Sequence, residues 1–229
     1  MGLRESSMAD FLRAYQLDIM LALIGVCGIT AFFVHITGTL SKKRKTALLL
    51  LELYSTVLLL ADRFAYIYRG DVSRTGYWMV RISNFLVFFM TLAIVQALIL
   101  YIHDLLMNEG GLKEPPLSIK VAEVTVVVGE VLVIISQFTG LYYTFDENNY
   151  YTRSPLYPVS FVFPTTIFFI IMTLLIKYRN RFRKLILYPL MLFVIVPVLA
   201  AFVQLFSYGL SLINMSIIMY RVFSDRYCV

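Results

Sequence analysis

The chain has 229 residues and a formal net charge of +6; 60% of its residues are hydrophobic and 15% are charged. A soluble domain has about 45–50% apolar and about 25% charged residues, so this composition excludes a typical soluble domain. It also excludes disordered, coiled-coil and collagen-like chains. The two cysteines, Cys27 and Cys228, match no disulfide framework and no zinc or haem-attachment spacing. The composition therefore predicts an integral membrane protein.

Continuous apolar stretches recur along the chain, and a membrane-spanning helix needs about 20 apolar residues. The stretches lack the alternating polar positions of a barrel strand, which favours helices. The sequence predicts an all-α, polytopic membrane bundle of six to seven helices, over Leu17–Leu40, Thr46–Tyr68, Trp78–His103, Ile119–Tyr143, Val159–Ile176, Leu185–Ser207 and Leu210–Phe223. The last range, at about 21 Å, is shorter than the roughly 30 Å hydrocarbon core.

Most of the 20 basic residues flank alternate ends of these helices, so that they fall on one side of the bundle. They lie in four places: Lys42–Lys45, Lys113 with Lys120, Lys177–Lys184, and Arg221 with Arg226. The positive-inside rule assigns this side to the cytoplasm. We therefore expect a multi-pass protein of the cell membrane with residues 1–16 outside, a transmembrane domain over 17–223 and a cytoplasmic tail over 224–229. Topology and anionic lipid headgroups explain the charge, so we expect no nucleic-acid partner.

The predicted outer side carries aromatic and turn-forming residues. Tyrosines and the single tryptophan gather at the outer ends of the second, third and fourth helices, which is typical of a membrane interface. The polar segment Asp146–Ser154 is expected to be a loop. Pro189 and Pro197 fall inside the sixth helix, where each removes a backbone hydrogen bond.

Ionisable side chains within a span are costly in lipid and are therefore candidate functional residues. The second and third spans contain five polar or charged candidates: Glu52, Asp62, Arg63, Arg81 and Asn84. Because a short hairpin joins these spans, we expect Asp62 and Arg81 to form an ion pair. Two interpretations remain open for this region. One is an outward-opening polar cavity that binds a small ligand or senses protons; the other, which the position near the interface favours, is a structural clamp.

The fourth span carries Glu123 and Glu130, which are seven residues apart and therefore on one helix face. Glu130 is expected near mid-membrane, about 16 Å deep, as a candidate ligand or proton sensor. Glu52 and Glu123 are candidate intramembrane polar residues, which in the structural interpretation reach toward the inner surface. His35 and His103 have no paired ligand, and no catalytic or cofactor-binding motif is present. We therefore expect no metal site, no cofactor and no enzymatic activity.

Two stretches resemble a known family. They are Asp62–Asp71 (DRFAYIYRGD), which runs into Gly76–Phe89 (GYWMVRISNFLVFF), and Gln204–Asn214 (QLFSYGLSLIN). They are similar to the N-terminal seven-transmembrane sensory region of bacterial histidine kinases and GGDEF-type diguanylate cyclases. The resemblance implies a sensor that passes a signal through its last helix to a cytoplasmic output domain. Only six residues follow Phe223, so we expect the output domain on a longer form of the chain or on another protein.

The leading hypothesis is a non-enzymatic, membrane-embedded sensory module. Its partners would be the lipid bilayer and, where they exist, a small-molecule ligand and a cytoplasmic output domain or a second copy of the chain. The alternative is a small transporter or channel lined by Glu130 and intramembrane glutamines. A membrane enzyme such as a lipid-modifying transferase is the weakest hypothesis. Neither of the two histidines, nor any pair of acidic residues, is placed to activate a substrate.

Overall fold

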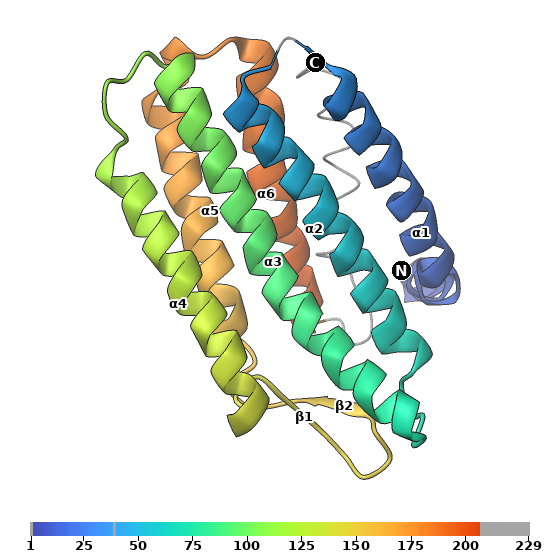
Figure 1. The fold of residues 1–229 in the computed structure, drawn as a ribbon. Coiled ribbons are helices and arrows are strands. Elements are labelled where there is room, and N and C mark those ends of the chain that lie inside the picture. Colours follow the sequence, from blue (N-terminus) through green and yellow to red (C-terminus); the bar gives the residue numbers. More distant parts are fainter. Residues whose placement is uncertain (1, 39, 207–229) are drawn as a thin grey trace.

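The computed structural model describes the backbone of residues 2–38 and 40–206, and the side chains of residues 15–38 and 40–200. Within these ranges the chain is mostly helical, as the sequence predicts (Figure 1). The helices are α1 (Gly2–Ile36), α2 (Lys42–Ile67), α3 (Arg74–Asn108), α4 (Leu117–Thr139), α5 (Val159–Lys177) and α6 (Lys184–Phe206). A 3-10 helix, η1 (Arg179–Arg181), follows α5, and the strands β1 (Tyr143–Phe145) and β2 (Tyr151–Arg153) form an antiparallel hairpin between α4 and α5.

The helix boundaries agree best with the predicted ones for α5 and α6. α1 begins at Gly2, within the segment 1–16 that we expected to precede the first span, and α3 extends beyond both predicted ends. α4 ends at Thr139 rather than Tyr143. The segment Asp146–Ser154, expected as a loop, contributes β2. The predicted last span and the tail over 224–229 lie outside the described residues.

Local interactions explain where the helices begin and end. The Ser41 hydroxyl accepts the N–H of Arg44 at 3.1 Å and caps α2, and the Ser73 hydroxyl accepts the N–H of Gly76 at 3.0 Å and caps α3. Each bond satisfies one of the N–H groups that have no partner in the first turn of a helix. Gly140 follows the last residue of α4 and terminates the helix, because its φ of 65° is a left-handed conformation that glycine adopts without strain.

Consecutive helices run antiparallel, so the connectors lie at the two ends of the bundle (Figure 1). The connectors after α1, α3 and α5 are at one end, which we call the basic end (residues 40–45, 109–120 and 177–184). The turn between α2 and α3 and the β-hairpin are at the other, which we call the hairpin end (residues 67–78 and 140–158). The helices thus bring together basic segments that are far apart in the sequence.

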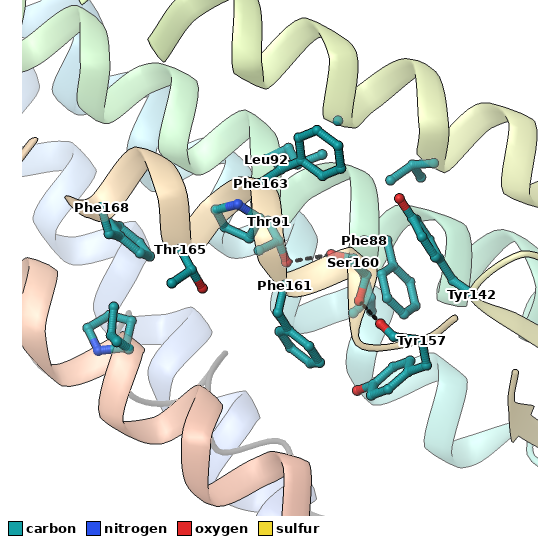
Figure 2. A pocket seen from close by; sticks show the side chains of 16 residues that line it. Phe88, Thr91, Leu92, Tyr142, Tyr157, Ser160, Phe161, Phe163, Thr165 and Phe168 are labelled. Atoms are coloured by element: carbon teal, nitrogen blue, oxygen red, sulfur yellow. Dashed lines mark hydrogen bonds between the residues drawn. The ribbon is translucent and has the colours of Figure 1, made fainter. Parts of the chain in front are cut away.

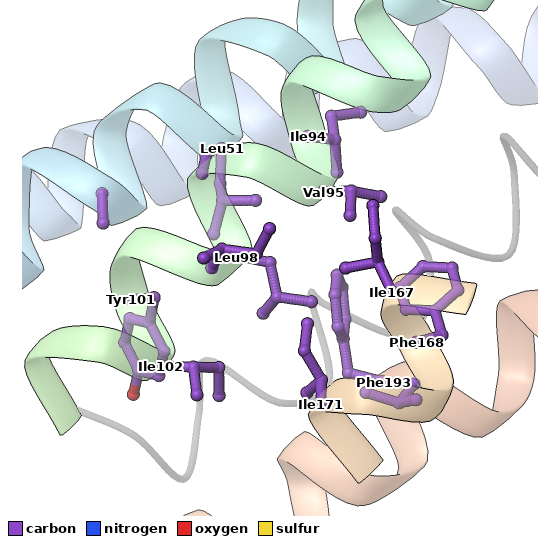
Figure 3. Packing of buried hydrophobic residues seen from close by; sticks show 14 of the residues in the cluster. Leu51, Ile94, Val95, Leu98, Tyr101, Ile102, Ile167, Phe168, Ile171 and Phe193 are labelled. Carbon is purple, nitrogen blue, oxygen red and sulfur yellow. The ribbon is translucent and has the colours of Figure 1, made fainter. Parts of the chain in front are cut away.

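α3 lies at the centre of the bundle and packs against α2, α4 and α5. Half of its most apolar 18-residue stretch is buried, compared with 17% for α1. Figure 3 shows the resulting core, in which Leu98 and Ile102 of α3 lie beside Ile171 of α5 and Phe193 of α6. Contacts along α3 therefore hold most of the other helices in place.

Apolar side chains also cover the perimeter of the bundle. Large apolar residues are exposed on all six described α-helices, among them Phe32, Phe138, Phe169 and Leu199, of which Phe138 is 86% exposed. Three described segments, Tyr15–Ile36, Arg74–Asn108 and Val159–Lys177, are long and apolar enough to cross a membrane. An apolar perimeter of this extent is a surface that water does not favour, and it fits contact with lipid.

Threonine hydroxyls on this surface are satisfied within their own helices. Thr125 donates to the carbonyl of Val121 at 2.7 Å, and Thr173 donates to that of Phe169 at 2.8 Å. Such a bond to the carbonyl four residues earlier leaves no hydroxyl proton without an acceptor. These side chains can therefore face an apolar medium without the cost of an unpaired donor.

Candidate functional site

The basic end contains a buried ion-pair cluster that joins α2 to α3. Arg44 Nε donates to Asp104 Oδ2 at 3.1 Å, and Arg44 Nη1 donates to Glu109 Oε1. Asp104 also accepts from the Ser41 hydroxyl at 2.9 Å and from Asn108 Nδ2 at 2.7 Å. The side chain of Asp104 is only 2% exposed, so its charge depends on these donors rather than on water.

Arg181 links this cluster to the connector between α5 and α6. Its Nη1 donates to the carbonyl of Gly110 at 2.8 Å, which ties the segment between α5 and α6 to the segment between α3 and α4. Basic residues at this end therefore have specific structural partners in addition to the topological role that the sequence predicts.

The polar face of α2 is buried within the bundle. Glu52, Ser55 and Asp62 are 3%, 0% and 6% exposed, and their spacing places them along one side of the helix. The Ser55 hydroxyl has no hydrogen-bond partner among the described residues. Glu52 is therefore enclosed within the bundle, whereas the structural interpretation has it reach toward the inner surface.

The predicted ion pair between Asp62 and Arg81 is wrong. Arg81 Nη1 donates instead to Asn149 Oδ1 at 2.6 Å and to the carbonyl of Tyr77 at 3.1 Å. Asn149 belongs to the β-hairpin, so the guanidinium is held by a segment nearly seventy residues away rather than by the neighbouring helix. The interpretation of Arg81 as part of a clamp is compatible with this geometry, although the partner differs.

The other predicted site residues are not gathered in one place. Asn84 Nδ2 donates to the carbonyl of Val80 in its own helix at 2.7 Å, and Arg63 donates to the carbonyl of Leu17 in α1. On α4, Glu123 is exposed and Glu130 is half-buried. The roles proposed for these residues in sensing stay predictions.

Asn149 organises the hairpin end. It has a φ of 62°, a left-handed conformation that asparagine tolerates better than most residues. Its Nδ2 donates to the carbonyl of Asp71 at 2.8 Å, and its own carbonyl accepts the N–H of Gly70 at 3.3 Å. A side chain at Gly70 would collide with the ring of Tyr150, 2.7 Å from the position of a Cβ atom. One asparagine thus joins the β-hairpin to the turn between α2 and α3.

A small pocket lies between α3, α4, α5 and α6 near the hairpin end, and we call it the central pocket. It has a volume of about 90 Å³. Figure 2 shows the rings of Phe88, Phe161, Phe163 and Phe168 around it, with the hydroxyl group of Tyr142 directed to the space among them. Because a water molecule needs about 10–15 Å³ by this measure, there is room for a small organic group.

The polar groups of the central pocket differ in how well they are paired. Thr91 donates to the carbonyl of Val87 at 2.7 Å, and Ser160 donates to that of Tyr157 at 2.7 Å. The Tyr142 hydroxyl, in contrast, is buried and has no hydrogen-bond partner among the described residues. A buried hydroxyl without a partner costs about 1–3 kcal/mol, so a ligand that pairs with it removes this cost.

A larger groove of about 510 Å³ lies beside the central pocket, between the start of α3, the end of α4 and β1. We call it the hairpin groove; its lining includes Arg81, Ile82, Phe85, Gln137, Tyr143 and Thr144. Tyr142 and Tyr143 are adjacent in the chain but line different cavities, and both stack on Phe88, with ring centroids 6.0 and 5.1 Å away. A single phenylalanine therefore contacts the walls of both cavities.

Tyr143 lies in β1, beyond the end of α4. Burial raises the pKa of its hydroxyl to about 12, and the hydrogen bond with Gln137 opposes part of this shift. The hydroxyl is therefore neutral at physiological pH. It lies 2.9 Å from Gln137 Nε2 and 3.1 Å from Gln137 Oε1.

Comparisons with known proteins identify no relative: no family model matches the chain, and no curated protein or solved structure matches it. The resemblance to bacterial sensory regions therefore stays a prediction. Among the described side chains, no group of three or more histidine, cysteine, aspartate or glutamate residues is placed to hold a metal ion.

Sequence reasoning missed Asp104 and Asn149, and it treated Tyr142 only as part of the aromatic interface. Asp104 directly follows a long apolar stretch, and a charged residue at such a position is typical of the end of a membrane-spanning helix. The run Asp146–Asn149 does signal a tight turn, because aspartate and asparagine favour turns. Nothing in the sequence identifies which distant segment that turn contacts.

The ion-pair cluster generates a prediction for stability. Asp104→Ala leaves Arg44 buried with Glu109 as its remaining acid and removes the acceptor used by Ser41. Removal of one member of a buried pair costs about 3–5 kcal/mol, and the retained Glu109 contact places the expected loss near the lower limit. The measurement is unfolding of the purified protein in detergent. Glu114→Ala, an exposed acid at the same end, is the matched control, and equal stability of the two variants would contradict this role.

Proposed function

We propose that the chain is a multi-pass membrane protein in which each of the helices α1 to α6 crosses the bilayer, with the basic end in the cytoplasm. The apolar perimeter supports this arrangement. So do the helix lengths: α2 and α4 have 26 and 23 residues, or about 39 and 34 Å, against a hydrocarbon core of roughly 30 Å. The hairpin end carries exposed Tyr77, Trp78 and Tyr150, which suit a membrane interface.

We propose further that the protein is a sensory module that receives a small, largely apolar ligand in the central pocket. The observation that carries this proposal is the buried Tyr142 hydroxyl, which has no described partner and lies in a pocket shared by four helices. Pockets of this kind, apolar with a few polar groups, are the usual form of a small-molecule site.

The lining of the central pocket supports a route for the signal. Pro164 of α5 and Pro197 of α6 both line it, and each lies inside its helix. A proline leaves a backbone carbonyl without its helical partner and lowers the resistance of the helix to bending. A ligand that binds one packing arrangement more tightly shifts the population toward it. On this proposal the change in α6 passes through the predicted last span to a cytoplasmic output domain of the diguanylate cyclase or histidine kinase type.

The orientation is tested by cysteine labelling. In a Cys27→Ala, Cys228→Ala background, Asn148→Cys places a thiol in the exposed turn of the β-hairpin and Asn180→Cys places one at the basic end. A membrane-impermeant maleimide is expected to label position 148 in intact cells and position 180 only after permeabilisation. The reverse pattern would overturn the orientation, and labelling of both positions in intact cells would overturn the multi-pass arrangement.

The sensory role is tested without knowledge of the ligand by filling the pocket. Val133 is 3% exposed and lines the central pocket, whereas Val131 on the same helix is 47% exposed. With a diguanylate cyclase output domain fused after the C-terminus, Val133→Phe is expected to change cyclic di-GMP production at least threefold, because the added ring imitates an occupied pocket. Val131→Phe is the control. Equal output from both folded variants would contradict the proposal.

Transport is a second candidate function, and the buried acids of α2 favour it. Glu52 and Asp62 lie about 15 Å apart along one side of the helix, with Ser55 between them. Buried ionisable groups within a membrane often mark a path for ions or protons.

Proton flux distinguishes the two functions. In proteoliposomes under an imposed potassium diffusion potential, a transporter is expected to acidify or alkalise the lumen faster than empty liposomes do, as read by a pH-sensitive dye. Glu52→Gln is expected to abolish that flux, whereas the exposed Glu123→Gln preserves it. Flux no faster than in empty liposomes removes proton transport and leaves the sensory proposal.

A further inference from the structure

The hairpin groove contains a positive charge that the chain itself does not neutralise. Among the described residues, none of the hydrogen bonds and ring contacts of Arg81 involves a carboxylate. The partners of Arg81 are an amide oxygen, a main-chain carbonyl and aromatic rings. The groove therefore has a positive electrostatic character.

The existing contacts of Arg81 leave one edge of the guanidinium available. Nη1 is used by Asn149 and by the carbonyl of Tyr77, and the group packs 3.6 Å from the ring centre of Tyr77 and 4.6 Å from that of Phe145. Nε and Nη2 make no hydrogen bond with the described residues. These two nitrogens form the fork with which arginine binds a phosphate or a carboxylate through two parallel hydrogen bonds.

The other polar groups of the groove are already paired. The Gln137 side chain interacts with Tyr143, and the hydroxyl of Thr144 lies 3.0 Å from that of Thr152. They add little to the recognition of a ligand. The charge of Arg81 is therefore the main polar feature that a ligand meets.

The rest of the groove is apolar. Trp78, Ile82 and Phe85 line it from successive turns of α3, and Trp78 and Ile82 are 55% and 49% exposed. Their spacing of four and three residues places them on one helix face that leads from the hairpin end toward the middle of the bundle. A molecule that binds Arg81 through an anionic head and contacts this apolar wall with a hydrocarbon chain therefore matches the groove.

We propose that the hairpin groove binds an anionic amphiphile, with a phosphate or carboxylate head on Arg81 and an alkyl chain along Ile82 and Phe85. Two sources supply such chemistry: an anionic phospholipid of the surrounding bilayer, and a free single-chain amphiphile. This inference does not rest on the sensory role of the central pocket.

Trp78 supplies a direct measurement, because it is the single tryptophan of the chain and it lines the groove. One arm uses nanodiscs that contain brominated phosphatidylglycerol or brominated phosphatidylcholine and compares the quenching of tryptophan fluorescence. The other arm adds decyl phosphate to protein in neutral phosphatidylcholine nanodiscs, with inorganic phosphate and the neutral decyl maltoside as comparisons.

Saturable binding of decyl phosphate is expected, at least tenfold tighter than binding of inorganic phosphate. Arg81→Gln is expected to weaken it about tenfold, since a hydrogen bond to a charged group contributes enough for that change. Arg74→Gln removes the same charge from an exposed position at the start of α3 and is expected to change nothing. Stronger quenching by the anionic brominated lipid, again dependent on Arg81, identifies a bilayer lipid as the occupant; a response to decyl phosphate alone identifies a free amphiphile.

Three results overturn the proposal: equal quenching by anionic and neutral lipids with no response to decyl phosphate, equal affinities of the Arg81→Gln and Arg74→Gln variants, or inorganic phosphate binding as tightly as decyl phosphate. If Arg81→Gln does not fold, Ile82→Phe tests the same groove while the contacts of Arg81 with Asn149 are kept. The added ring narrows the groove and is expected to weaken the binding of decyl phosphate at least fivefold. An unchanged affinity contradicts the proposal.

Discussion

Apolar side chains surround this helical bundle on its outside, and this arrangement constrains the polar groups of the molecule. A donor or acceptor that faces hydrocarbon cannot exchange its protein partner for water. The threonines of the perimeter accordingly donate to carbonyls of their own helices, and the buried Asp104 collects donors from Arg44, Ser41 and Asn108. The few groups without such partners are therefore the most informative about binding.

The two ends of the bundle satisfy this constraint differently. At the basic end, ion pairs and main-chain hydrogen bonds tie the connectors together through Arg44 and Arg181. At the hairpin end, Asn149 joins two connectors, and both cavities lie beside them. Stacking of Phe88 on Tyr142 and Tyr143 connects the walls of these cavities. A ligand in either cavity is thus expected to lie near these three stacked rings. The contacts at the basic end hold the helices in register.

The helical architecture was largely predictable, because long apolar stretches allow few other structures. The bounds of α5 and α6 differ from the predicted ones by one residue at most among the described residues. The site was much less predictable. Asp62 and Arg81 were paired because their depths agree, but depth along a helix does not determine which side of the helix a residue occupies. The guanidinium instead meets Asn149, which the hairpin brings from far along the chain.

The sequence by itself determined that this chain is mostly helical, where its apolar stretches lie and which connectors carry the basic residues, because these properties depend on local composition and spacing. Only the tertiary structure decided that Glu52 is enclosed, that Asp104 pairs with Arg44, and that Tyr142 and Arg81 line cavities. These depend on the rotation of each helix about its axis and on contacts between distant segments. Packing of the whole bundle sets both, and no single stretch of sequence contains that information.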